Sequence, residues 1–367
     1  MQEYFAVIED PRYQGFVKHK LSDILTIVAC AVLCGMGRLC DIMAYAENKK
    51  EFFRTHFGIE KIPSKPTISR TLAVIDGQKV AEIIMAMMQD AIGLSGDVIA
   101  VDGKAIRSTS QNGTPHSALQ IITAYLTESG VVLGQEKIHE KTNEIPVFQK
   151  MMSYLNLKKK TVTADAMHCQ RTTCSMILDK GGDYLFGLKK NQKTLHDDVE
   201  RYFNDCPDSA KIDKFSTTEK NGGRVEKRIC KKVEDVGWLQ ELHDWPGLRA
   251  FFSIERTVTV GGKTTSETSY YITSADASAK QLLTFAREHW AIESMHWSLD
   301  VVFSEDSSRF ISENAHLCLN ALRKYALAVH KKYLATQPKK CSVKRHLMDC
   351  LLSEQLLLKL ISFSRIL

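Results

Sequence analysis

The chain has 367 residues, of which 44% are hydrophobic and 25% charged, and its net charge at pH 7 is +6. These values are typical of a globular protein with a sizeable core and exclude a collagen-like or highly charged disordered chain. The mild positive charge favours a polyanionic partner without identifying one. The longest apolar stretch, Ile24–Met36, is too short to cross a bilayer, and no secretory signal is evident. We therefore expect a cytoplasmic protein with no membrane partner.

The ten cysteines are scattered along the chain and form no CxxC pair. A four-ligand zinc site is therefore not expected. Four of the cysteines lie in apolar, helix-like stretches, namely Cys30, Cys34, Cys318 and Cys350. This pattern predicts reduced, mostly buried thiols rather than disulfides.

Residues 1–95 have the pattern of a helical N-terminal domain. The predicted helices are Leu21–Cys34 with Ser22 as its N-cap, Ile42–His56, and Ala81–Ile92. Between the last two, the segment Ile62–Leu72 combines a proline-bounded turn with a short helix that carries Arg70. Such a segment is equally consistent with a helix-turn-helix DNA reader and with a capped connector helix.

From residue 96 the pattern changes to strands alternating with helices. The predicted strands are 98–101, 118–127, 131–138, 161–164 and 184–188, and the predicted helices are 145–154, 171–178 and 192–203. Three strands joined by turns, followed by alternating helices and strands, predict an α/β fold. Its expected form is an RNase H-like mixed sheet flanked by helices.

Residues 204–273 read as a β-rich insertion, with strands at 224–233, 248–260 and 264–273 and a Gly261–Gly262 hairpin turn. Helices resume at Ala279, where one helix is expected to run to Phe303 and another to follow at Glu313–Tyr333. The expected domains are thus 1–95 (helical), 96–203 with 274–335 (catalytic), 204–273 (insertion) and 336–367 (a C-terminal helical tail).

Three acidic residues stand in settings that suggest chemistry. Asp102 ends an apolar run that reads as a strand entering a turn, and Asp165 ends the strand 161–164. Glu293 lies in the helix that starts at Ala279. Carboxylate oxygens suit Mg²⁺ or Mn²⁺, and two such ions can activate a water and stabilise a leaving oxygen on phosphorus. Taken singly, Asp102 is as readily a turn residue and Asp165 a helix cap.

At these motifs the chain resembles bacterial insertion-sequence transposases of the DDE type, specifically the H-repeat-associated group. The resembling stretches occur in order and cover most of the chain. They are Ala100–Arg107, Thr163–His168, Leu188–Gln192, His289–Glu293, His296–Asp300 and Phe303–Asp306.

This resemblance implies an RNase H-like catalytic domain interrupted by a β insertion before the catalytic glutamate. Carried over by position, Asp102, Asp165 and Glu293 would be the catalytic residues and the ligands of two Mg²⁺ or Mn²⁺ ions. The implied function is metal-dependent DNA cleavage and strand transfer at the ends of an insertion-sequence element. The implied partners are the terminal inverted repeats, target DNA and a second protomer on DNA, with the protein nucleoid-associated when bound. The alternatives are an inactive DNA-binding remnant of a mobile element and a structure-specific nuclease of the same fold.

The sequence departs from related transposases around the glutamate. Those proteins often place an arginine four residues before it and a lysine seven residues after it, where this chain has His289 and Asp300. The candidates for contacting DNA phosphates are therefore Lys104, Arg107, Lys189, Lys190, Arg70 and His289. Helical spacing predicts that His289, Glu293, His296 and Asp300 share one face, which also leaves open a zinc site on the first three. Trp290 and Trp297 are expected to be packing anchors.

Overall fold

The computed structural model describes residues 1–367 except 111–117, 139–142, 206–210, 309, 311 and 367. Packing divides the chain into two compact units. The first consists of Met1–Gly96, Gly103–Asn143 and Glu293–Leu367, and the second of Asp97–Asp102 and Glu144–Ile292. The first unit thus combines residues from both ends of the chain. The domain boundaries expected from the sequence stay a prediction.

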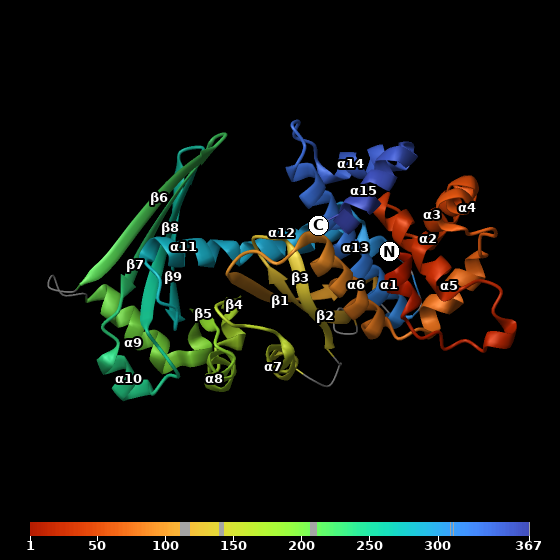
Figure 1. Ribbon diagram of the computed structural model, residues 1–367. Coiled ribbons are helices and arrows are strands. Elements are labelled where there is room, and N and C mark those ends of the chain that lie inside the picture. Colours follow the sequence, from red (N-terminus) through yellow and green to blue (C-terminus); the bar gives the residue numbers. More distant parts are fainter. Residues whose placement is uncertain (111–117, 139–142, 206–210, 309, 311, 367) are drawn as a thin grey trace. The chain divides into compact units, whose positions relative to one another are not determined.

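The first unit is mainly helical (Figure 1). Its helices are α1 (Gln2–Ala6), α2 (Leu21–Leu33), α3 (Leu39–Asn48), α4 (Lys50–Phe57), α5 (Lys65–Val74), α6 (Gly77–Ile92), α12 (Trp290–Val301, from Glu293), α13 (Glu313–Ala335), α14 (Val343–Leu352) and α15 (Glu354–Ile366). The centre of the unit is α13, which is buried continuously from Ala315 to His330 and packs against α2, α5, α6, α14 and α15. Helix α6 also packs against the strand β3 (Val131–Ile138), which pairs with β2 (Leu119–Leu126).

Two sequence expectations in this unit are wrong. Ser22 is not the N-cap of α2, because Lys20 takes that position and the Ser22 carbonyl accepts a hydrogen bond from the Thr26 hydroxyl inside the helix. The expected helix Ile42–His56 is two helices, α3 and α4, because the backbone of Lys49 leaves helical geometry, with φ −111° and ψ 27°.

The second unit contains the parallel core of the sheet. Strand β1 spans Val98–Ile106, and its part up to Asp102 belongs to this unit. The other elements before the insertion are α7 (Glu144–Tyr154), β4 (Thr161–Ala164), α8 (Arg171–Asp179), β5 (Asp183–Leu188) and α9 (Lys193–Asn204). Strand β4 pairs in parallel with β1 on one side and with β5 on the other. All four residues of β4 are buried, as its run of apolar and threonine residues predicts.

The insertion is a four-stranded antiparallel ribbon with one short helix. Its elements are β6 (Ile212–Asn221), β7 (Arg224–Val233), α10 (Gly237–His243), β8 (Ala250–Val260) and β9 (Lys263–Thr273). The predicted hairpin turn is confirmed: Gly261 and Gly262 have φ of +56° and +79°, values that favour glycine. Helix α11 (Ala279–Glu288) packs across β6 and β7 (Figure 1), with Leu282 and Leu283 in a cluster that includes Phe252.

Among the described residues, nine strands form one mixed sheet in the order β3-β2-β1-β4-β5-β9-β8-β7-β6. The first five positions, with antiparallel β2–β3 and parallel β1–β4–β5, confirm the predicted RNase H-like arrangement. The expected turn at Asp102–Gly103 is wrong, because β1 continues to Ile106 beside β2. The expected helix from Ala279 to Phe303 is two helices, because α11 ends at Glu288 and α12 begins at Trp290.

Candidate active site

Two aspartates lie at matching positions on neighbouring parallel strands. Val101 of β1 is opposite Ala164 of β4, so the residues that follow them, Asp102 and Asp165, stand side by side with their side chains on the same face of the sheet. Parallel strands lie about 4.8 Å apart, a spacing at which two carboxylates can share a cation. Asp165 is exposed and Asp102 partly exposed, so the pair is open to solvent.

A third carboxylate close to this pair, Glu144, was missed by the sequence analysis. Glu144 is the first residue of α7. Burial raises its pKa, and the charges of Asp102 and Asp165 raise it further. Four residues along the same helix, Phe148 stacks on His168, with ring centroids 4.3 Å apart. No local pattern singles out Glu144, because only the packing of α7 brings it near the aspartates.

His168 and His289 are held as neutral imidazoles on the same side of the sheet. His168 is 2% exposed, and its burial lowers its pKa to about 4 although the charges of Asp165 and Asp102 oppose this. The Nδ1 atom of His168 has no hydrogen-bond partner among the residues that the structure describes. Burial also lowers the pKa of His289, whose Nδ1 lies 3.1 Å from the Thr163 hydroxyl. Thr163 is two residues before Asp165, so this contact holds the His289 ring beside the candidate site.

Amide side chains fix the loop that carries Asp165. The Asn191 amide donates to the Ala166 carbonyl over 2.6 Å, and the Gln192 amide donates to the Cys169 carbonyl over 2.9 Å. Both come from the stretch after β5, which lies next to β4. Lys189 and Lys190 of this stretch are exposed. The Leu188–Gln192 motif thus combines two loop-holding amides with two accessible cations.

Glu293 belongs to the first unit and is exposed in the first turn of α12. His296, three residues further along α12, is only 9% exposed. The expectation that Trp290 and Trp297 are packing anchors is wrong, since each is 60% exposed.

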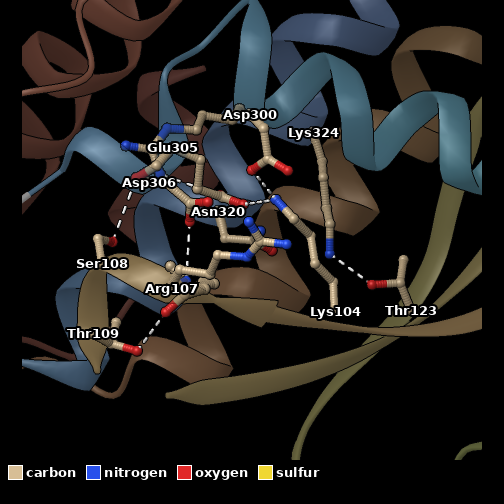
Figure 2. Close-up of polar contacts among 12 residues, drawn as sticks. Lys104, Arg107, Ser108, Thr109, Thr123, Asp300, Glu305, Asp306, Asn320 and Lys324 are labelled. Atoms are coloured by element: carbon tan, nitrogen blue, oxygen red, sulfur yellow. Dashed lines mark hydrogen bonds and ion pairs between the residues drawn. The ribbon is translucent and has the colours of Figure 1, made fainter. Parts of the chain in front are cut away.

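Lys104 lies in a buried ionic network of the first unit (Figure 2). Its ammonium lies 2.5 Å from an Asp300 oxygen and 2.6 Å from Glu305 Oε2. The other Glu305 oxygen accepts hydrogen bonds from Asn320 and Arg323. Although burial of Glu305 opposes ionisation, the charges of Arg323 and Lys104 prevail and lower its pKa to about 2. Asp300, which by sequence alone would repel DNA phosphate, is therefore partly neutralised by Lys104.

The remaining predicted cations of the first unit are exposed. Arg107 follows β1 and is exposed, and its backbone N–H donates to an Asp306 carboxylate oxygen over 3.0 Å (Figure 2). Arg70 is exposed on α5, near the end of the predicted reader segment. Lys104 differs from both, because its side chain is only 12% exposed.

Comparison with known proteins gives the family of the chain. A family model described as "Transposase DDE domain" matches residues 93–329. The chain belongs to the DDE transposase family. A second model, described as DDE_Tnp_1-associated, matches residues 2–88. The resemblance to the H-repeat-associated group is confirmed by the relatives described next.

Two relatives from Escherichia coli match this transposase over most of their length. The O157:H7 protein named "Putative transposase YncI" is 36% identical over 334 residues, which cover 89% of this chain and 85% of the relative. The K12 protein named "H repeat-associated putative transposase YhhI" is 33% identical over 343 residues, covering 90% and 89%. A piggyBac transposase structure, solved as a synaptic complex with hairpin DNA, aligns with a TM-score of 0.43 at 11% identity, covering 99% of this chain and 77% of that one.

The DDE domain match contains Asp102, Asp165 and Glu293, together with Glu144 and the insertion.

The nine cysteines among the described residues are all free, and seven of them are buried, which confirms the predicted thiols for this part of the chain. Within the same residues, no helix of the transposase is both long and apolar enough to cross a membrane.

Proposed function

We propose that this transposase cleaves and rejoins DNA strands at the ends of an insertion-sequence element, using divalent metal ions held by Asp102, Asp165 and Glu293. The observation that supports this most directly is the register of β1 and β4, which stands the two aspartates side by side. The set is all carboxylate and exposed, a donor chemistry that fits Mg²⁺ or Mn²⁺ better than softer metals. When bound, two such ions would supply a nucleophilic oxygen and stabilise the leaving oxygen on phosphorus.

In this proposal each protein residue has a defined task. The three carboxylates act as ligands rather than as general bases. Asn191 and Gln192 hold the loop on which Asp165 depends. His289, fixed against Thr163, can donate a hydrogen bond from its remaining ring nitrogen to a DNA phosphate without adding charge.

The proposed DNA contacts are cationic. Lys189 and Lys190 are exposed just after β5, beside the strand that leads to Asp165, and Arg107 and Arg70 are exposed in the first unit. Lys104 is proposed to act with them after leaving Asp300 and Glu305, the two carboxylates with which its ammonium forms ion pairs. The proposed ligands are the terminal inverted repeats and target DNA, bound by a homodimer on the nucleoid in the cytoplasm.

The test is a cleavage and strand-transfer assay on DNA that carries the terminal repeats flanking the gene, with Mg²⁺ or Mn²⁺. Asp102→Asn, Asp165→Asn and Glu293→Gln should each abolish both reactions while DNA binding persists. Chelation of the divalent ion should have the same effect. Asp97→Asn is the matched control, because Asp97 is an exposed aspartate just before β1 whose side chain is 77% exposed.

The outcomes separate the proposal from its alternatives. DNA binding without cleavage by the wild-type protein would indicate an inactive remnant. Cleavage that ignores the terminal repeats and follows DNA structure would indicate a nuclease of the same fold. Cleavage by Asp102→Asn at the wild-type rate would contradict the assignment of the site.

A further inference from the structure

A second cluster of metal-binding side chains lies in the first unit, among the C-terminal helices. His330 of α13 and His346 and Cys350 of α14 are all buried, and one potential ligand atom from each lies within 4.8 Å of the others. His346 and Cys350 are four residues apart and therefore share one face of α14. The cluster has nitrogen and sulfur donors, unlike the all-carboxylate set of the proposed active site.

The hydrogen bonds of His330 prepare one of its nitrogens for a metal. The Nε2 of His330 lies 3.0 Å from the Leu33 carbonyl, which can only accept, so Nε2 carries the proton. With its proton on Nε2, the neutral ring presents a lone pair at Nδ1. A ring N–H bonded to a backbone carbonyl is the usual support of a metal-binding histidine.

His346 presents its own Nδ1 to the same point. The two Nδ1 atoms are 2.7 Å apart. Because His330 Nδ1 carries no proton, the hydrogen bond between them is donated by His346 Nδ1 in the metal-free protein. Zinc binding would move that proton to the Nε2 of His346, which has no hydrogen-bond partner among the described residues. Tyr333 stacks on the His346 ring with centroids 5.1 Å apart and an interplanar angle of 13°, which holds the ring in place.

We propose that His330 Nδ1, His346 Nδ1 and Cys350 Sγ bind a Zn²⁺ ion that fastens α14 to α13. Tetrahedral zinc with its usual bond lengths requires about 3.3 Å between two nitrogens and about 3.6 Å between nitrogen and sulfur. The two rings therefore need to separate by about half an ångström. Zinc binds the thiolate, so the Cys350 thiol releases its proton to solvent as the zinc–sulfur bond forms.

Cys34 lies near this cluster but is not one of its members. It directly follows Leu33, but its sulfur is not among the donor atoms that lie within 4.8 Å of one another, so the proposed fourth ligand is a water. The Cys34 thiol also contacts the Tyr45 hydroxyl over 3.8 Å. A cavity of about 500 Å³ is lined by Tyr45, by Gly35, which follows Cys34, and by Leu351, which follows Cys350.

The experiment uses the full-length protein, stripped with a chelator and then titrated with Co²⁺ in excess Mg²⁺. Cobalt bound by a thiolate gives a sulfur-to-metal charge-transfer band and strong visible bands, whereas cobalt bound by carboxylates gives neither. One equivalent should produce these bands, and one equivalent of Zn²⁺ should remove them. Cys350→Ser should lose the charge-transfer band, whereas Cys318→Ser, a buried cysteine of α13 outside the cluster, should keep it.

Absence of the band in the wild-type protein, or its survival in Cys350→Ser, would overturn the proposal. If Cys350→Ser does not fold, the wild-type titration and a rise in Tm on adding Zn²⁺ decide, since a ligand that binds only the folded state stabilises it. Asp102→Asn separates this inference from the proposed function. That variant should lose DNA cleavage and keep the cobalt bands.

Discussion

Glu305 accepts a hydrogen bond from Arg323 over 3.2 Å at a point where neither side chain is exposed. Glu305→Gln would leave the Arg323 charge buried without a counter-charge. Breaking a buried ion pair in this way costs about 3–5 kcal/mol. We expect a loss of unfolding free energy of that size, measured by urea denaturation. The control is Glu313→Gln, which breaks a surface pair with Lys137 and should cost at most about 1 kcal/mol. Equal losses in the two variants would contradict the role of the network.

The buried Lys324 should make the unfolding free energy depend on pH. Its ammonium donates to Thr123 over 2.8 Å and to Gln135 over 2.9 Å, and burial lowers its pKa from 10.5 to about 7 although the charge of Glu305 opposes this. Between these two values the unfolded chain binds more protons than the folded one, so the unfolding free energy should rise as pH increases from about 7 to about 10. Lys324→Met should flatten this slope in urea denaturation at several pH values. The exposed Lys339→Met should keep it, and an unchanged slope in Lys324→Met would refute the prediction.

Substitution of Asn191 and Gln192 should slow DNA cleavage without weakening DNA binding. Each hydrogen bond from these side-chain amides to the loop after β4 contributes about 0.5–1.5 kcal/mol to the stability of that loop. Asn191→Ala with Gln192→Ala should therefore slow DNA cleavage by about tenfold or more, because Asp165 is less firmly placed. The readout is the cleavage rate at saturating metal, with DNA affinity measured in parallel. Asn204→Ala, an exposed asparagine at the end of α9, is the control. A rate equal to that of the control would show that the amides do not position the site.

Substitution of Lys189 and Lys190 should reduce the salt dependence of DNA binding. Each lysine that contacts a phosphate adds about 0.9 to the magnitude of the slope of log affinity against log salt. Lys189→Ala with Lys190→Ala should reduce that slope by about 1.8. Binding to terminal-repeat DNA measured between low and physiological salt gives the slope. The control is Lys50→Ala, on α4 beside Glu47, which should leave the slope unchanged. An unchanged slope in the double variant would show that Lys189 and Lys190 do not contact DNA.

Short apolar runs made the sheet predictable. Strands β4 and β7 occur at the expected residues because continuous or alternating apolar positions determine them locally. The same reasoning failed at Asp102–Gly103, where a turn-forming dipeptide lies within β1 because pairing beside β2 overrides the local preference. Helix spacing places Glu293 and His296 three residues apart on α12, but spacing alone could not show that tertiary packing buries only His296.

The candidate sites were predictable only where a motif marks them. Asp102 and Asp165 stand at the ends of apolar runs and could be found from the chain. Glu144 approaches them only through the packing of α7, and the partners of Lys104 lie about two hundred residues away, at separations of 196 and 201. The cluster of His330, His346 and Cys350 carries no CxxC signal, because its members come from two helices.

Gly77, at the start of α6, touches the start of α13: an added Cβ there would lie 2.6 Å from the Asn314 carbonyl oxygen, and the Gly77 N–H donates to the Asn314 side chain. The earliest helices thus pack against a segment made more than two hundred residues later. A copy of this gene cut short by a stop codon before α13 should leave α1 to α6 without this packing partner, so it should yield no folded first unit able to compete with intact enzyme for DNA.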